Sequence, residues 1–255
     1  MSELIFYEFP LNERIRVFMR LEQLFLQADH FLQGKTVWDC RAMIASLLDI
    51  LAILGRNDLK SELLKELERQ SSTLTRMSES GAVDRNRLRS TLDELAVIGG
   101  EIYDCCGRLG GGLMESELFK SISQRSSIPG GSCVFDLPAY HYWLEQAEET
   151  RHRQLEQWLK SFNILRRAIT LILRLIRLST VPVEEVASGG FFQQSLDKNL
   201  PYQLIRVGVS RGLPHYAEIS GGKQRFTVRF MTFETAIRPT QTEESIAFQL
   251  TCCAF

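Results

Sequence analysis

Apolar residues recur every three or four positions between residues 12 and 33, as they do on one face of an α-helix. This apolar face is made of Ile15, Phe18, Leu21, Phe25, Leu32 and their neighbours. Polar residues step at the same interval along the opposite face, where Arg16 and Arg20 lie one turn apart. Asn12 precedes the pattern and suits the N-cap position. We therefore predict an amphipathic helix that buries one face and presents both arginines on the other.

The helical period continues through several further segments, and residues typical of helix ends separate them. The expected starts are Thr36 with Asp39, Asp58, Asp84 and Glu115; Gly55 ends the first of these helices and the last ends near Arg125. Asp136 is interpreted as the N-cap of another short helix, which Pro138 enters in its first turn. These segments predict a largely helical first part of the chain.

The longest helical pattern begins near Glu148 and is predicted to be one helix. Its apolar positions follow a heptad-like spacing: Leu155, Trp158, Phe162, Leu165, Ile169, Ile172 and Ile176. The second half is apolar nearly all round, which is typical of a helix in the centre of a bundle or at an interface. Because the spacing extends over only about three heptads, a bundle core is favoured over a dimer seam.

After Pro182 the period changes to two, which is typical of β-strands. The segments that show it are GGFFQQ (189–194), YQLIRVGV (202–209), HYAEIS (215–220), KQRFTVRFM (223–231) and SIAFQLTCC (245–253). Phe226, Val228 and Phe230 are expected on one face of their strand, opposite Arg225, Thr227 and Arg229. Gly221 and Gly222 predict a hairpin turn, since glycine tolerates the positive φ of primed turns.

Helices followed by strands predict an α+β fold, with a helical bundle packed with a mostly antiparallel β-domain. The β-prone runs LIFYEF (4–9) and SCVFD (132–136) are expected to join the sheet from earlier in the chain. The predicted helical domain covers residues 11–180, with a β insertion near 130–136. The predicted β-domain combines residues 4–9, 131–136 and 187–255.

Composition and charge give little indication of the kind of partner. The net charge of −1 gives no reason to expect nucleic-acid binding, so any basic recognition surface must be local. The six cysteines include no C-x-x-C pair, which favours reduced thiols over a zinc site or disulfides. The N-terminus lacks a basic signal-peptide region, and Arg174 and Arg177 interrupt the most apolar stretch. We expect a cytoplasmic protein without membrane insertion.

Motifs for catalysis do not match. The glycine-rich segments GRLGGG (107–112) and SGGKQ (220–224) lack the GK[ST] of a phosphate-binding loop, and there is no G-x-S-x-G. The histidines, which are His30, His141, His152 and His215, have no metal-binding spacing. We expect no catalytic site, no metal and no cofactor. A hydrolase or transferase on the same α+β scaffold is the alternative.

Five segments, in order along the chain, resemble those of the ZapD family of Z-ring-associated proteins. They are YEFPLNERIRVFMRLEQLF (7–25), LLKELERQ (63–70), SIPGGSCVFDLPAYHYWL (127–144), SGGKQRFTVRFM (220–231) and FQLTCC (248–253). The resemblance implies a helical domain, a β-domain and a symmetric dimer. It also implies that the dimer holds the C-terminal tail of the tubulin-like division GTPase FtsZ, and that it bundles FtsZ protofilaments at the mid-cell division site without catalysis.

The resemblance also implies where the tail would bind. The family's basic positions correspond to Arg16, Arg20 and His141 of this chain. A further basic position of the family falls near Glu117 here, and Lys120 or Arg125 could supply that charge from an adjacent turn. From residue type alone, both helix arginines would be a solvated face and His141 a half-buried histidine bonded to backbone. With the resemblance, recognition of the tail is the preferred interpretation.

Overall fold

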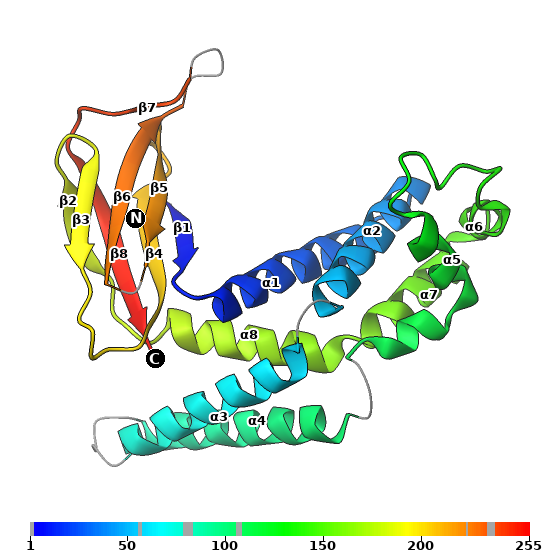
Figure 1. The fold of residues 1–255 in the computed structure, drawn as a ribbon, viewed down its shortest axis with the longest axis horizontal. Coiled ribbons are helices and arrows are strands. Elements are labelled where there is room, and N and C mark those ends of the chain that lie inside the picture. The colour runs from blue at the N-terminus through cyan, green and yellow to red at the C-terminus, as the bar shows by residue number, and fades with distance from the viewer. Residues whose placement is uncertain (1–2, 56–57, 79–83, 106–108, 223, 234–237) are drawn as a thin grey trace. The chain divides into compact units, whose positions relative to one another are not determined.

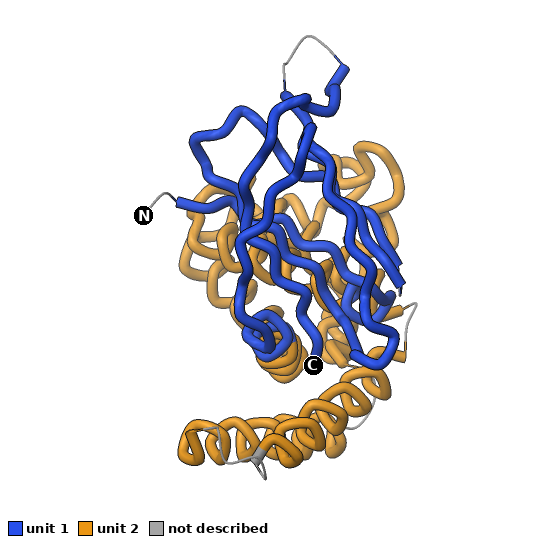
Figure 2. The backbone as a smooth tube through the Cα atoms, turned by 90° about the vertical axis from the view of Figure 1, so that its left-hand side faces the viewer, with its two compact units in different colours: residues 1–17, 173–255 blue, residues 18–172 orange. Residues whose placement is uncertain are grey.

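The computed structural model describes residues 3–55, 58–78, 84–105, 109–222, 224–233 and 238–255. The chain divides into two compact units, shown in different colours in Figure 2. Unit 1 combines Met1–Val17 with Leu173–Phe255, and unit 2 is Phe18–Ile172. The helices lie mainly in unit 2 and the strands in unit 1, so the predicted α+β class is confirmed.

The helices follow the predicted order along the chain (Figure 1). They are α1 (Glu13–Leu32), α2 (Val37–Leu54), α3 (Leu59–Ser78), α4 (Arg85–Asp104), the 3₁₀ turn η1 (Gly111–Glu115), α5 (Glu117–Arg125), α6 (Pro138–Leu144), α7 (Glu148–Lys160) and α8 (Asn163–Arg177). The apolar faces predicted from the period are buried, because side chains three and four residues apart lie on the same side of a helix. In α1, for example, Ile15, Phe18 and Leu21 are fully buried.

The predicted capping residues hold the helix starts. The Asn12 side-chain oxygen accepts a hydrogen bond from the Ile15 amide at 2.9 Å. Thr36 and Asp39 form a reciprocal capping box at the start of α2, and Gly55 is its C-cap. The Asp84 carboxylate accepts bonds from the first turn of α4. These bonds satisfy amides that otherwise lack a partner at a helix start.

The prediction of one long helix from Glu148 is wrong, because Ser161 and Phe162 form a turn between α7 and α8. The ring of Phe162 is fully buried against Gly110, where a β-carbon would lie 2.2 Å from a ring atom. All seven residues of the heptad-like series are nevertheless at most 5% exposed. These residues are buried within the single chain, so the interpretation as core is confirmed. They cannot also form a dimer seam.

Unit 1 contains two antiparallel sheets (Figure 1). The first has the strand order β1-β4-β8-β2, with β1 (Leu4–Pro10), β4 (Tyr202–Ser210), β8 (Ile246–Ala254) and β2 (Val183–Ala187). The second has the order β3-β6-β5, with β3 (Phe191–Ser195), β6 (Arg225–Thr232), β5 (His215–Gly221) and a short β7 (Thr240–Gln241) paired to β6. The predicted N-terminal strand and C-terminal strands therefore share this unit.

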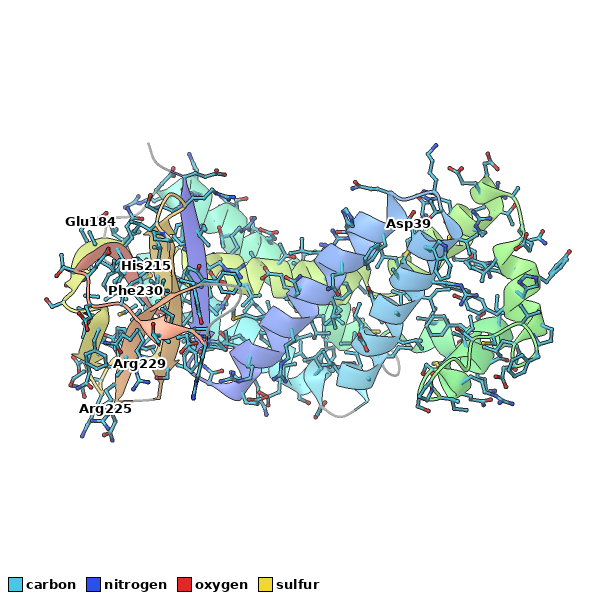
Figure 3. The ribbon with its side chains drawn as sticks, turned by 90° about the horizontal axis from the view of Figure 1, so that it is seen from above. Asp39, Glu184, His215, Arg225, Arg229 and Phe230 are labelled. Atoms are coloured by element: carbon cyan, nitrogen blue, oxygen red, sulfur yellow. The ribbon has the colours of Figure 1, made fainter. Side chains whose placement is uncertain are left out.

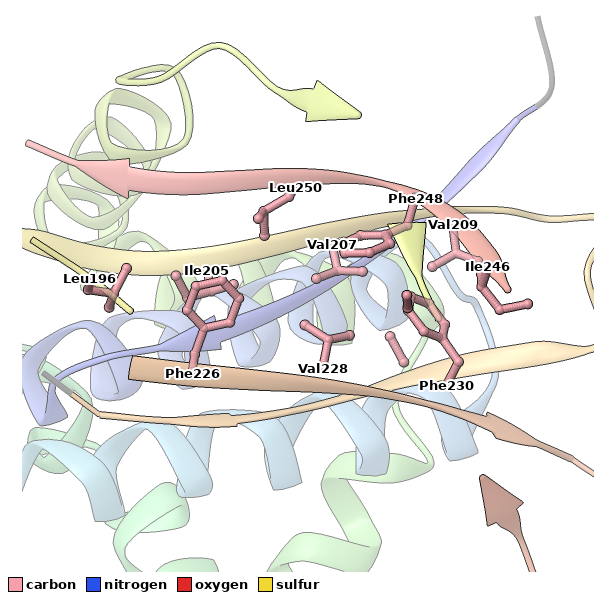
Figure 4. Close-up of a cluster of buried hydrophobic side chains, with 12 residues drawn as sticks. Leu196, Ile205, Val207, Val209, Phe226, Val228, Phe230, Ile246, Phe248 and Leu250 are labelled. Atoms are coloured by element: carbon pink, nitrogen blue, oxygen red, sulfur yellow. The ribbon is translucent and has the colours of Figure 1, made fainter. Parts of the chain in front are cut away.

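The two sheets enclose one apolar core, shown in Figure 4. Alternate residues of each strand point into it, among them Val207 of β4, Phe248 of β8, and Phe226 and Phe230 of β6. The opposite face of β6 carries the exposed Arg225 and Arg229, as the period of two predicted. Burying these side chains is the main favourable contribution to the stability of the unit.

A carboxylate joins three elements on the other face of the first sheet. Glu8 of β1 lies directly opposite Arg206 of β4, and their side chains are 2.7 Å apart. Arg177, in the last turn of α8, donates two further bonds to the same carboxylate at 2.8 and 3.0 Å. All three side chains are less than a quarter exposed. Partial burial strengthens such charged hydrogen bonds relative to those on an open surface.

One expected strand is corrected, and one strand was not expected. Residues 131–136 form consecutive turns within unit 2 and not a strand of the β-domain, because their backbone bonds are local, such as Leu137 N–H to Cys133 C=O at 3.0 Å. Conversely, β2 carries adjacent glutamates that break the alternation, so its sequence did not indicate a strand. The remaining limits of the predicted domains stay predictions, since compact units need not fold separately.

A double-glycine turn carries the chain from the first sheet to the second. Gly189 and Gly190 both have positive φ, 56° and 65°, and Phe191 N–H bonds to Ser188 C=O at 3.2 Å. The predicted hairpin at Gly221 is confirmed by the pairing of β5 with β6, but positive φ is found in this other turn. The peptide of Gly190 also exchanges bonds with β6 and the segment after β7. A β-carbon on Gly190 would lie 2.5 Å from the Thr242 carbonyl oxygen.

Replacing Gly190 with alanine should therefore lower the free energy of unfolding by about 2–4 kcal/mol, from positive φ plus a backbone clash. Gly189→Ala is the matched control, because its φ is also positive but no atom lies within 4 Å of the new β-carbon. It should lower stability by only about 1 kcal/mol. Urea titration followed by circular dichroism measures both. Equal destabilisation by the two variants would contradict the clash.

Candidate functional site

Arg16 is already engaged by its own N-terminal neighbours. Its Nε lies 3.2 Å from the Glu13 carboxylate, and its guanidinium carbon lies 5.7 Å from the centre of the Phe9 ring. A third contact, from a terminal nitrogen to the Pro10 carbonyl oxygen, is 3.5 Å long. The side chain remains 37% exposed. A ligand carboxylate would therefore compete with Glu13 for this cation.

Arg20 lies one turn further along α1 and is in a different state. Its side chain is exposed, and within the described part of the chain it forms no hydrogen bond or ion pair. The neighbouring α1 residues Phe18 and Leu21 are fully buried, so the helix backbone that carries Arg20 is fixed. An exposed arginine on a fixed helix can meet an incoming anion without first breaking an intramolecular bond.

The basic residues of α5 are paired. Lys120 lies 3.3 Å from Glu117, one turn earlier in the same helix. Arg125 lies 3.1 Å from Asp136, which the sequence suggested as an N-cap. That suggestion is wrong: Leu137 occupies the N-cap position of α6 without a side-chain bond, and Asp136 binds the arginine instead. Pro138 is the first residue of α6, as predicted.

His141 lies on α6, whose position is fixed by a stack of aromatic rings. Tyr140 stacks on Trp143 at 6.0 Å, and Trp143 stacks on Trp158 of α7 at 5.7 Å between ring centres. Burial raises the pKa of Tyr140 to about 12, so this phenol stays neutral at physiological pH. His141 itself is half-buried. Before α6, the Gly131 amide donates to the Ile128 carbonyl at 2.8 Å and closes a turn.

The residues expected to bind a partner do not form one cluster. The bond from Arg125 to Asp136 ties α5 to the turn before α6, so Lys120, Arg125 and His141 belong to one region. That region adjoins the far end of α1, since Lys35, just after α1, pairs with Glu148, just after α6. Arg20 lies twelve residues before the end of α1, about 18 Å at 1.5 Å per residue. Figure 1 likewise shows α6 beyond the C-terminal end of α1 and the N-terminal end of α2.

The structure adds a group of four residues that the sequence did not indicate. The Arg41 guanidinium carbon lies 5.6 Å from the centre of the Trp38 ring and 5.1 Å from that of Tyr140. One of its nitrogens donates to the Ser132 hydroxyl at 3.0 Å. We call Trp38, Arg41, Ser132 and Tyr140 the Arg41 platform. The spacing of Trp38 and Arg41 places them on one side of α2, but only the fold brings Ser132 and Tyr140 to them.

A second group of basic side chains lies on unit 1. Arg225 and Arg229 project from the exposed face of β6, as Figure 3 shows. Glu218 of β5 is directly opposite Arg229 and reduces the local positive charge. Arg225 and Arg229 are thus exposed on the face opposite the buried Phe226, as expected from the sequence.

The described residues contain no group of three or more His, Cys, Asp or Glu side chains placed to bind a metal ion. Among the described helices, each is too short or too polar to cross a bilayer. The surface offers cationic side chains: Arg20 is exposed, and Arg41 is partly exposed with two aromatic rings beside it. Such groups suit recognition of an acidic, partly apolar partner.

Fold and surface define a class of α+β protein in which a helical unit and a two-sheet unit carry exposed basic side chains. The sequence model of the family described as "ZapD: Cell division protein" matches residues 19–229. The chain belongs to this family of cell division proteins.

Several relatives are similar over nearly their whole length, and each bears the name "Cell division protein ZapD". The relative from Methylococcus capsulatus is 52% identical over 253 residues, which are 99% of each chain. Those from Dechloromonas aromatica and Aromatoleum aromaticum are 38% and 37% identical, and cover 98% of this chain. The match spans both units, so it concerns the whole fold and supports a role in cell division.

Thiol reactivity should separate the described cysteines. Cys133 is exposed in the turn before α6, whereas Cys253 is fully buried. Burial raises the pKa of Cys252 to about 11 and that of Cys253 to about 12. At pH 8 about a thousandth or less of either thiol is thiolate, the reactive form. Iodoacetamide should therefore label Cys133 at least tenfold faster than Cys252 or Cys253. Mass spectrometry of peptides measures the labelling rates. Equal rates in the folded protein would contradict this; equal rates in urea are the control.

Proposed function

We propose that this chain binds the C-terminal tail of FtsZ and crosslinks FtsZ protofilaments into bundles that support the Z-ring. The observation that carries the proposal is membership of the cell division family over nearly the full length, including 52% identity to one relative. The proposal places the protein in the cytoplasm at the mid-cell division site. It assigns no catalytic step and no cofactor.

The chemistry of the exposed residues supports this function. A flexible tail with acidic and apolar residues needs a basic, partly apolar surface, and loses entropy when it becomes ordered. Arg20 supplies an exposed cation that has no described partner. Arg16, Lys120 and Arg125 supply cations that are held in intramolecular ion pairs. We propose that Arg20 and His141 contribute most, and that the paired cations contribute less because a ligand must displace their partners.

Crosslinking requires two tail sites that face different filaments, and we propose that a homodimer provides them. One weak site per subunit is enough, because the second tail binds at the effective concentration set by the first. The heptad-like apolar residues of α8, such as Ile169 and Ile172, are buried within the chain, so the dimer is expected to use other residues. A closed pair also fits the prevalence of twofold symmetry among protein oligomers.

Charge reversal at Arg20 tests the tail site. Arg20→Asp should weaken binding of a fluorescent FtsZ tail peptide about tenfold or more, because it replaces an attractive charge with a repulsive one. His141→Gln should weaken it less, since it removes only one contact. Arg89→Asp is the matched control: Arg89 is also exposed on a helix, α4, and has no described partner. Anisotropy gives the affinity, and pelleting with FtsZ polymers reports bundling.

An exposed substitution should change stability by only about 0.5 kcal/mol, so circular dichroism of Arg20→Asp should match that of the original protein. If Arg20→Asp and Arg89→Asp bind and bundle equally well, Arg20 is not part of the site. If the unmodified protein neither binds the tail nor bundles polymers, the proposed function itself is wrong.

The homodimer is tested by sedimentation velocity at micromolar concentration. We expect a species of about twice the 29.2 kDa chain mass, as closed twofold assembly requires. The dimer should persist at high salt if apolar burial holds it together. A single species at the chain mass over the whole concentration range would rule out the dimer and leave peptide binding as a separate question.

A further inference from the structure

The Arg41 platform holds a cation in one orientation without neutralising it. Two aromatic rings and one hydroxyl group hold the guanidinium in place. Rings and hydroxyls orient an arginine but leave its positive charge intact. Within the described residues no carboxylate lies within 4.0 Å of Arg41. Some other arginines of unit 2 are neutralised: Arg125 pairs with Asp136, and Arg167 pairs with Glu101.

Exposed apolar side chains belong to the platform or closely follow it in sequence. The Trp38 ring, one side of the platform, is 76% exposed. Val134 and Phe135, which closely follow Ser132 in the turn before α6, are 53% and 84% exposed. Exposed residues of this size, next to a fixed cation, are typical of sites where another molecule binds. Tryptophan and arginine are also the residues that most often dominate the energy of protein interfaces.

The far side of the platform is rigid. Tyr140 is only 2% exposed and stacks on Trp143, itself buried and stacked on α7. Ser132 lies in a turn whose backbone amides and carbonyls bond to one another. Arg41 is therefore ordered before any ligand arrives. A preordered side chain loses little entropy on binding, so more of each contact appears as affinity.

We propose that the Arg41 platform is a docking point for an extended acidic peptide, with a carboxylate on Arg41 and an adjacent apolar side chain on Trp38. The peptide chemistry follows from charge complementarity, because the platform offers an uncompensated cation next to exposed apolar surface. The inference rests on the proposed function, and it names Trp38 and Arg41 as determinants of tail binding. They lie in the α6 region with His141, apart from Arg20.

The test uses the full-length protein and the fluorescent FtsZ tail peptide. Trp38→Ala and Arg41→Gln should each weaken binding about tenfold, as expected for residues at the centre of an interface. Arg41→Lys should have an intermediate effect, since lysine keeps the charge but loses the planar stacking and the paired donors. Arg89→Gln, on α4, is the control for the loss of one positive charge from unit 2 and should bind as the unmodified protein does.

A second peptide, in which every Asp and Glu is replaced by Asn and Gln, isolates the charge. This neutral peptide should bind the unmodified protein more weakly than the acidic peptide does. Its affinity should fall little further with Arg41→Gln, because the ion pair is already absent. Its response to Trp38→Ala should persist. If Arg41→Gln lowers the affinity for both peptides by the same factor, Arg41 does not bind a carboxylate, and the proposal is overturned.

The remaining outcomes separate the platform from the proposed function. If the unmodified protein binds the peptide and both Trp38→Ala and Arg41→Gln bind equally well, the platform is overturned and the function stands. If these variants change sedimentation and not peptide affinity, the platform contacts a second copy of the chain, which also overturns it. If the unmodified protein does not bind the peptide, both proposals fail.

Discussion

The β unit depends on the pairing of the first strand with a strand near the end of the chain. Glu8 of β1 and Arg206 of β4 are directly opposite each other although they are 198 residues apart in sequence. Without β1, the backbone amides and carbonyls along that side of β4 would lose their partners, and Tyr7 and Phe9 would leave the core. The ends of the chain therefore belong to one structure.

The shared carboxylate of Glu8 makes this pairing specific. A slip of one residue would turn Glu8 towards the apolar core and separate it from both arginines. Arg177 brings the last turn of α8 to the same carboxylate. Forming such a partly buried ion pair adds little net stability. Removing one of its partners is costly, because the remaining charge is left without compensation. The cluster thus determines register and helix position more than it adds to stability.

Much of this architecture could be predicted from period alone. The helix from Asn12, the capping box at Thr36, and the alternation of Phe226, Val228 and Phe230 are local patterns, and the structure confirms them. Residues 131–136 have strand-like composition, but a strand also needs a neighbouring edge, which composition does not show. The turn at Ser161 and Phe162 interrupts an apolar period that continues on both sides of it, so the period did not show the break.

The candidate surface was less predictable, because it depends on contacts between distant residues. The hydrogen bond from Arg41 to Ser132 joins residues 91 apart in sequence. Whether an arginine is free or paired is also decided by the fold: Arg16 and Arg20 look alike in sequence, yet only Arg16 has Phe9, Pro10 and Glu13 within reach.

Synthesis order gives the discontinuous sheet a further consequence. β1 leaves the ribosome almost two hundred residues before its partner β4. At about 5–20 residues per second, β1 waits roughly 10–40 seconds for that partner. During this interval its apolar residues have no sheet to cover them, and unpaired strands are prone to associate with other chains. The nascent chain is therefore vulnerable to aggregation through β1 until β4 has been synthesised.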